Sequence, residues 1–132
     1  MKKILFVCVH NSGRSQMAEA FFNQLAEDKS VALSAGTEPG AGVNPTVVKV
    51  MQEAGIDLSR NIPKALTQDM LDEAYKVISM GCGVEVACPA TYIKTEDWGL
   101  QDPKGQPIEK VREIRDEIRR MVDHLLQSLE SK

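Results

Sequence analysis

Residues 8–15 place a cysteine, an arginine and a serine at a spacing that could bind an oxyanion and attack it. Five residues separate Cys8 from Arg14, and Ser15 follows directly. Together with Arg14, the candidate binding residues are Val9, His10, Asn11, Ser12 and Gly13. A loop wrapped around a helix N-terminus presents backbone N–H groups and the positive end of the helix dipole, which together bind tetrahedral oxyanions. Arg14 can add a planar pair of donors.

Cys8 is the candidate nucleophile of this segment. A helix N-terminus and a nearby arginine stabilise a thiolate, and the Ser15 hydroxyl could donate a hydrogen bond to the sulfur. We expect Gly13 to supply the backbone freedom of a tight loop and His10 to be an exposed spacer. The spacing alone is weak evidence, because a buried structural cysteine followed by an exposed arginine would also produce it.

Cys82 and Cys88 are the two remaining cysteines and are candidate redox residues. They do not form a Cys-x-x-Cys motif. On a continuous helix their Cα atoms would lie about 9 Å apart along the axis, whereas a disulfide requires roughly 4.4–6.8 Å. A disulfide between them therefore requires a loop or the unwinding of a helical turn. Two unrelated buried residues are the alternative, but a nucleophilic Cys8 favours a redox switch.

Asp102 is the candidate general acid, in the polar stretch 97–106. Pro103 restricts the residue before it to an extended conformation, which can aim the carboxylate. A partly buried aspartate near an oxyanion can hold the proton that a departing hydroxide needs. On its own, an Asp-Pro pair is more often simply a turn.

Composition narrows the class of protein. The chain has 132 residues and a formal net charge of -3, so we expect one domain over 1–132 and no general binding of nucleic acid. No apolar run approaches the ~18 residues of a membrane span. We therefore expect a cytoplasmic monomer, whose thiols stay reduced. Cys8, His10, Cys82 and Cys88 match the spacing of zinc sites poorly, and we expect no bound metal.

The apolar pattern predicts alternating strands and helices that would position these groups. Strands are expected at 2–9, 31–35, 76–80 and 91–94, and helices at 15–25, 45–54, 67–73 and 107–129. This order is typical of an α/β sandwich with a mainly parallel sheet. Ligands of such folds bind at the carboxyl ends of the strands. The loops after Val9, Met80 and Lys94 should therefore face one site.

Further motifs strengthen this interpretation and extend, in order, along nearly the whole chain. They are residues 16–20, 34–36 and 42–45, Cys82, Cys88-Pro89, Trp98-Gly99, Asp102-Pro103 and residues 112–118. With the Cys-x5-Arg-Ser segment, they resemble the low-molecular-weight protein tyrosine phosphatase superfamily and, within it, the thioredoxin-coupled arsenate reductases. The resemblance implies a three-layer α/β sandwich with a central four-stranded parallel sheet flanked by helices.

The resemblance also implies a reaction. Cys8 attacks arsenate while Asp102 assists the loss of hydroxide, and phosphate or sulfate would compete for the site. Cys82 then attacks the Cys8 sulfur and arsenite leaves with the bonding electrons. Cys88 finally displaces Cys8, and reduced thioredoxin, the electron donor, reduces the Cys82–Cys88 disulfide. No bound cofactor is implied.

Two features depart from the family pattern. Relatives commonly carry a second cysteine where this chain has Gly13, and the spacing between Cys82 and Cys88 is one residue shorter than in some of them. Some members also bind a potassium ion that steadies the loop. The residues that match or replace its ligands are Asn11, Glu19, Ser34 and, in place of a carboxylate, Lys64. We expect Lys64 to pair with Glu19 and activity not to depend on potassium.

Two other functions remain open at this point. A phosphatase acting on aryl phosphates would use the same Cys8, Arg14 and Asp102. Phosphatases of this type usually present tyrosines near the Asp-Pro loop, where this chain has Trp98. A non-enzymatic oxyanion or redox sensor is the third possibility, but no basic DNA-binding helix is evident.

Overall fold

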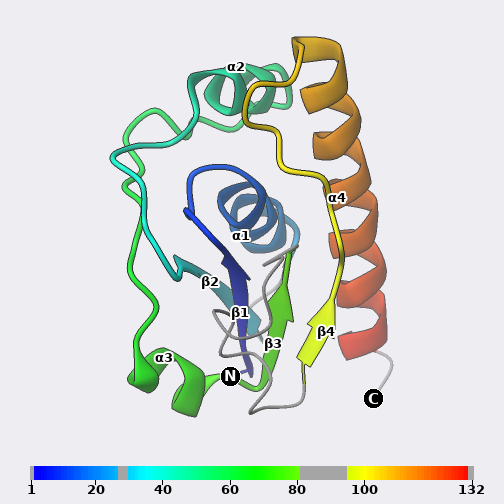
Figure 1. Cartoon of the computed structure of the whole chain (residues 1–132). Helices are drawn as coiled ribbons and strands as arrows, with labels where there is room; N and C mark the ends of the chain where they lie inside the picture. The colour runs from blue at the N-terminus through cyan, green and yellow to red at the C-terminus, as the bar shows by residue number, and fades with distance from the viewer. Residues whose placement is uncertain (1, 27–29, 81–94, 131–132) are drawn as a thin grey trace.

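A parallel sheet forms the centre of the computed structural model, which describes residues 2–26, 30–80 and 95–130 (Figure 1). Its strands are β1 (Lys2–Cys8), β2 (Ser30–Gly36), β3 (Lys76–Ser79) and β4 (Thr95–Asp97). Their order is β2-β1-β3-β4, and every neighbouring pair is parallel. The predicted four-stranded parallel sheet is confirmed.

Helices cover both faces of this sheet. They are α1 (Arg14–Leu25), α2 (Pro45–Glu53), α3 (Gln68–Glu73) and α4 (Ile108–Glu130). Along β1, Ile4 and Phe6 belong to a core shared with α1, α2 and α4, whereas Leu5 and Val7 pack with Leu71 of α3. Because successive strand residues point to opposite faces, β1 is buried on both sides, and the three layers are confirmed.

Local signals fix most helix ends. The Asn44 side chain accepts a hydrogen bond from the Thr46 backbone N–H, with Pro45 at the first helical position of α2. Gly55 follows α2 with a φ of 84°, a conformation that favours glycine. α1 begins at Arg14, one residue before the range that the apolar pattern predicted, and its N-cap is Gly13, which makes no side-chain capping bond. A serine inside the first turn is free to bond elsewhere.

The last strand was placed incorrectly. We expected it at 91–94, a segment that lies outside the described residues, and the structure has β4 at Thr95–Asp97. Two of its three residues are acidic, which hid it in the polar loop expected from Asp97. The strand pairs with β3 at the end of the described sheet order, where polar residues are tolerated.

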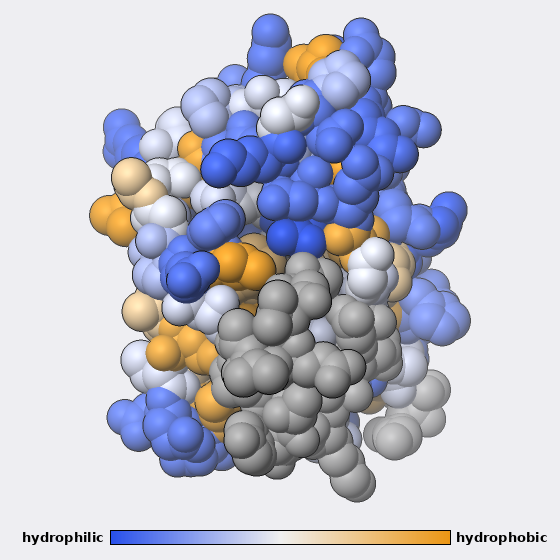
Figure 2. Space-filling view, in the orientation of Figure 1, coloured by the Kyte–Doolittle hydropathy of each residue, from blue (hydrophilic) through white to orange (hydrophobic). Residues whose placement is uncertain are grey.

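An ion-pair cluster fastens α2 to α4. Glu53 bonds to the guanidinium groups of both Arg112 and Arg115, with N–O distances of 2.8–3.0 Å. Hydrogen bonding to Arg112 is the largest cause that lowers the pKa of Glu53 to about 2. The outer side of α4 is hydrophilic (Figure 2), and none of the described helices is long and apolar enough to cross a membrane.

Candidate active site

The carboxyl ends of the strands meet at one edge of the sheet, where the Cys8–Arg14 segment begins. Cys8 pairs in register with Gly36 of β2, and Val7 with Ser79 of β3. Cys8 is a free, buried cysteine. Residues 9–13, which we call the anion loop, connect it to α1. The β1-loop-α1 arrangement that the sequence predicted is therefore present.

A neighbouring segment holds the anion loop from outside. The N–H groups of Glu38, Gly40 and Asn44 donate to the carbonyl oxygens of Val9, His10 and Ser12, at 2.8–2.9 Å. In a trans peptide the carbonyl and the following N–H point in opposite directions. The N–H groups of His10, Asn11 and Gly13 therefore point away from this segment, as an oxyanion cradle requires.

Close approach to β2 also shapes the loop. A side chain on Gly36 would begin 2.7 Å from the carbonyl oxygen of Val9, so only glycine lets the loop cross the end of β2 here. His10 lies at the rim, partly exposed, with Nδ1 2.9 Å from the carbonyl oxygen of Glu38. This contact holds the imidazole against the outer segment, at the edge of the pocket.

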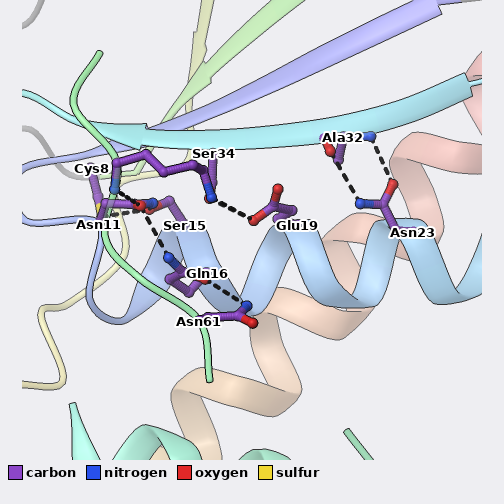
Figure 3. Close-up of polar contacts among 10 residues, drawn as sticks. Cys8, Asn11, Ser15, Gln16, Glu19, Asn23, Ala32, Ser34 and Asn61 are labelled. Carbon is purple, nitrogen blue, oxygen red and sulfur yellow. Dashed lines mark hydrogen bonds and ion pairs between the residues drawn. The ribbon is translucent and has the colours of Figure 1, made fainter. Parts of the chain in front are cut away.

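Asn11 is the structural centre of the loop. It is fully buried and has a φ of 50°, in the left-handed region that asparagine tolerates better than most residues. Its Nδ2 donates to Ser15 Oγ at 2.7 Å. Its Oδ1 accepts from Gln16 Nε2 at 3.0 Å and from the Lys64 backbone N–H at 2.8 Å (Figure 3). One side chain thus joins the loop, α1 and the 61–64 segment.

Two supporting residues were not predicted. Gln16 is fully buried, and its Oε1 accepts a hydrogen bond from Asn61 Nδ2 at 3.1 Å (Figure 3). A glutamine one position from the apolar residue Met17 gave no sign of burial. Asn61 lies in a segment without helix or strand, where the sequence offers no periodicity to place a side chain.

Ser15 lies beside the candidate nucleophile. Cys8 Sγ and Ser15 Oγ are 2.8 Å apart, and both residues are buried. Because Asn11 already donates to Ser15 Oγ, the serine proton is available for the sulfur. This geometry suits a serine that donates to a Cys8 thiolate.

Arg14 and Asp102 approach each other from opposite sides of the site. The Arg14 side chain is buried, and its NH1 donates to the carbonyl oxygen of Leu100 at 3.0 Å. Its NH2 is 3.9 Å from Asp102 Oδ2. Asp102 Oδ1 also accepts a hydrogen bond from the Lys104 backbone N–H at 3.0 Å, which orients the carboxylate.

Asp102 lies at the edge of the pocket and is about half-buried. Its side chain is 51% exposed, while Pro103 takes the buried position next to it. The backbone N–H of Lys104 fixes the orientation of this carboxylate at the edge of the pocket.

A pocket of about 570 Å³ lies between these groups. Cys8, Ser12, Arg14 and Asp102 line it, and among the described residues no phenylalanine, tyrosine or tryptophan does. The expectation that Trp98 stands near the Asp-Pro loop in place of the substrate-gripping tyrosines was wrong. Its ring packs on Phe6 in the core, with centroids 5.6 Å apart, because β4 carries it to the sheet.

The Glu19 group supports the loop from the other side. Ser34 Oγ donates to Glu19 Oε1 at 2.7 Å, and Lys64 Nζ is 3.5 Å from the same oxygen (Figure 3). The predicted Lys64–Glu19 pair is therefore present. Lys64 also contributes its backbone to Asn11, so the ion pair and the hydrogen bonds of the loop share one residue.

The structure thus brings together Cys8, Arg14, Ser15 and Asp102, with Asn11, Glu19, Ser34 and Lys64 around them. Cys82 and Cys88 lie outside the described residues. Within the described part of the chain, no group of three or more histidine, cysteine, aspartate or glutamate side chains could hold a metal ion.

Residues 3–132 match the family described as low molecular weight phosphotyrosine protein phosphatase. The chain belongs to that family. The family is the one that the motifs predicted, and its anion loop, arginine and Asp-Pro pair are the parts found here.

Curated relatives within this family carry arsenate reductase names. A putative arsenate reductase of Halobacterium salinarum is 43% identical over 127 residues, covering 92% of this chain and 89% of that protein. A glutaredoxin arsenate reductase of Synechocystis sp. is 39% identical over 130 residues, covering 96% and 97%. The similarity therefore extends over nearly the full length of each protein.

Solved structures of the family superpose closely. An arsenate reductase in the phosphate binding state has a TM-score of 0.86 at 39% identity, covering 97% of this chain and 98% of that one. A thioredoxin-dependent arsenate reductase of Corynebacterium glutamicum gives 0.81 at 35%, covering 98% and 62%. The YwlE arginine phosphatase of Geobacillus stearothermophilus gives 0.87 at 29%, covering 99% and 94%.

Proposed function

We propose that this chain is an arsenate reductase, an oxidoreductase that converts arsenate to arsenite. The observation that carries the proposal is the Cys8 sulfur 2.8 Å from Ser15 Oγ, beside a buried Arg14 and across the pocket from Asp102. The names of curated relatives at 39–43% identity support it. The proposal covers a single domain over residues 1–132.

The anion loop would bind the substrate. Backbone N–H groups of residues 9–13 and the Arg14 guanidinium would hold the arsenate oxygens, with Ser12 and Gly13 on the pocket side. Phosphate and sulfate have the same tetrahedral shape and would compete. A relative with 39% identity has been solved in a phosphate binding state, which supports an oxyanion at this place.

The first chemical step would form a sulfur–arsenic bond. The Cys8 thiolate attacks arsenic, and one arsenic–oxygen bond breaks. Asp102 gives its proton to the departing oxygen, which leaves as water. Ser15, donating to the sulfur, holds the nucleophile in place and stabilises its charge before the attack. Arsenic is still As(V) in this adduct.

Reduction would follow by thiol–disulfide chemistry. The Cys82 thiolate attacks the Cys8 sulfur, the sulfur–arsenic electron pair leaves with arsenic, and As(III) is released as arsenite. Cys88 then attacks Cys82, so Cys8 is regenerated and a Cys82–Cys88 disulfide remains. The cytoplasm, which keeps thiols reduced, is the compartment that this cycle requires.

A thiol-based redox protein would reduce this disulfide, and we propose thioredoxin as the donor. A 35% identical neighbour is named thioredoxin-dependent, whereas a 39% identical relative is named a glutaredoxin arsenate reductase. The test is therefore arsenate-dependent oxidation of NADPH with thioredoxin and its reductase, and in parallel with glutaredoxin, glutathione and glutathione reductase. Faster turnover with glutaredoxin would refute the choice of donor and leave the activity standing.

The cysteine variants test the activity itself. A reductase loses turnover with Cys8→Ser, Cys82→Ser and Cys88→Ser alike, because each thiol carries one exchange. A phosphatase, the second candidate, is favoured by the shared Cys8, Arg14 and Asp102 and by the superposition on an arginine phosphatase. It would keep aryl phosphate hydrolysis after the last two changes and show no arsenate turnover.

A further inference from the structure

Gly13 lies where the anion loop meets the Asp-Pro turn. A Cβ atom built on Gly13 would begin 2.9 Å from Pro103 Cγ and 3.6 Å from Pro103 Cδ. Carbon atoms that are not bonded rarely approach closer than about 3.5 Å. The space taken by Pro103 is therefore a reason for glycine here in addition to the backbone freedom expected from the sequence.

The Pro103 ring fills the space that a side chain would occupy. Pro103 is buried although both of its chain neighbours are exposed, and the next atom near the Gly13 position is Val47 Cγ2 at 3.7 Å. A proline ring is short and fixed to the backbone at both ends, so beyond a change of ring pucker it can give way only by moving the turn itself.

The turn around Pro103 is stiff and carries Asp102. The Gln106 N–H donates to the carbonyl oxygen of Pro103 at 3.1 Å, and the Lys104 N–H donates to Asp102 Oδ1 at 3.0 Å. A displacement of the ring is therefore passed to the carboxylate, which now lies 3.9 Å from Arg14.

We propose that Gly13 is a positioning residue, whose missing side chain seats Pro103 against the anion loop and so sets Asp102 beside Arg14. This inference rests on the proposed function, in which Asp102 protonates the departing oxygen. Moving the ring from 2.9 Å to ordinary contact displaces the acid by several tenths of an ångström or more. A misplacement of about 1 Å can lower a rate by roughly 100-fold.

The experiment is a double-mutant cycle of Gly13→Ala and Pro103→Ala. We expect Gly13→Ala to lower kcat for arsenate about tenfold or more, with the inhibition constant of inorganic phosphate changed less than about twofold. In the Pro103→Ala background, which lacks the Cγ atom that clashes, Gly13→Ala should lower kcat markedly less than it does in the wild-type background. Gly42→Ala controls for the addition of a methyl group to the pocket wall, because its Cβ would meet nothing within 4 Å and so would not touch Pro103.

The hydrolysis rates of two aryl phosphates distinguish a role in positioning the acid from a merely structural role. Loss of acid positioning should slow hydrolysis of phenyl phosphate more than that of p-nitrophenyl phosphate, whose leaving group needs less protonation. Any of three results would overturn the proposal. The two aryl phosphates could lose rate equally, Gly13→Ala could lower kcat equally in the two backgrounds, or the affinity for phosphate could fall in proportion to kcat.

Failure of the proposed function and failure of the role proposed for Gly13 would give different results. A wild-type protein without arsenate turnover would refute the proposed function, while aryl phosphate hydrolysis would still report on Gly13. The melting temperature supplies a readout that needs no turnover: Gly13→Ala should lower it more in the wild-type background than beside Pro103→Ala. Equal decreases would show that Pro103 is not seated on Gly13.

Discussion

Replacing Asn11 by alanine removes the hydrogen-bonding centre of the anion loop. Three bonds of 2.7–3.0 Å are lost, to Ser15, Gln16 and the Lys64 backbone. At about 1 kcal/mol each, they contribute about 3 kcal/mol. Alanine at a φ of 50° costs about 1 kcal/mol more. We expect the free energy of unfolding to fall by about 4 kcal/mol, and the melting temperature by about 10–20 °C.

Function should suffer beyond this loss of stability. The loop must present its N–H groups before the anion arrives, so a loosened loop binds phosphate more weakly. At a temperature where Asn11→Ala is still folded, we expect the affinity for inorganic phosphate to fall about tenfold or more. Urea unfolding measures the stability, and calorimetric titration measures the affinity.

Asn11→Gly and Asn23→Ala are the controls for this experiment. Asn11→Gly loses the same three bonds but accepts the φ of 50°, so its stability should exceed that of Asn11→Ala by about 1 kcal/mol. The Asn23 side chain donates to the carbonyl oxygen of Ala32 and accepts from its N–H, remote from the anion loop. Asn23→Ala should therefore lower the stability without lowering the affinity for phosphate. The reasoning is wrong if Asn11→Ala unfolds within about 1 kcal/mol of wild type, or if Asn23→Ala weakens phosphate binding as strongly.

Three further predictions concern charge. Because the Lys64 ammonium lies 3.5 Å from Glu19, added potassium should change neither the turnover nor the melting temperature of the wild-type protein. In the Lys64→Asp variant, both quantities should rise with the potassium concentration. A sodium series at equal ionic strength is the control. Ser15→Ala should slow alkylation of Cys8 by iodoacetamide at pH 7 about tenfold, since a bond to a charged sulfur contributes about 1.5–3 kcal/mol; an unchanged rate would argue against the serine as donor. Glu53→Gln should lower the melting temperature most above pH 4.5 and progressively less as the pH falls towards 2. The pKa of Glu53 is about 2 in the folded chain, whereas the unfolded carboxyl is already protonated at that pH, so the ion pairs lose their contribution to stability there. A difference in melting temperature between the variant and the wild type that stays constant across this range would contradict the role of the arginines.

The sequence predicted the parts of the site that depend on local order. Cys8, Arg14 and Ser15 sit where a buried strand gives way to a helix, and both elements have strong periodic signals. Their mutual geometry follows from eight consecutive residues, so little tertiary information was needed. The Lys64–Glu19 pair required the family resemblance, because 45 residues separate its members.

What the sequence did not predict depends on distant packing. Gln16 and Asn61 are polar residues whose partners come from other segments, and no periodicity marks them. The acidic strand β4 is held by its pairing with β3 rather than by an apolar pattern. Trp98 follows this strand and packs on Phe6, so it does not line the pocket.

The absence of an aromatic wall bears on the choice between the two candidate activities. An aryl phosphate needs apolar surface beside the reacting phosphorus, whereas arsenate needs only the cradle itself. Around the described part of the pocket the lining beyond the cradle consists of glycines, an alanine, prolines and the side chains of His10, Asn44, Asp102 and Lys104. Such a lining offers few contacts that would select one organic group over another, while Arg14 and Asp102 still face the pocket. We therefore expect hydrolysis of aryl phosphates to show a high KM rather than a defect in kcat.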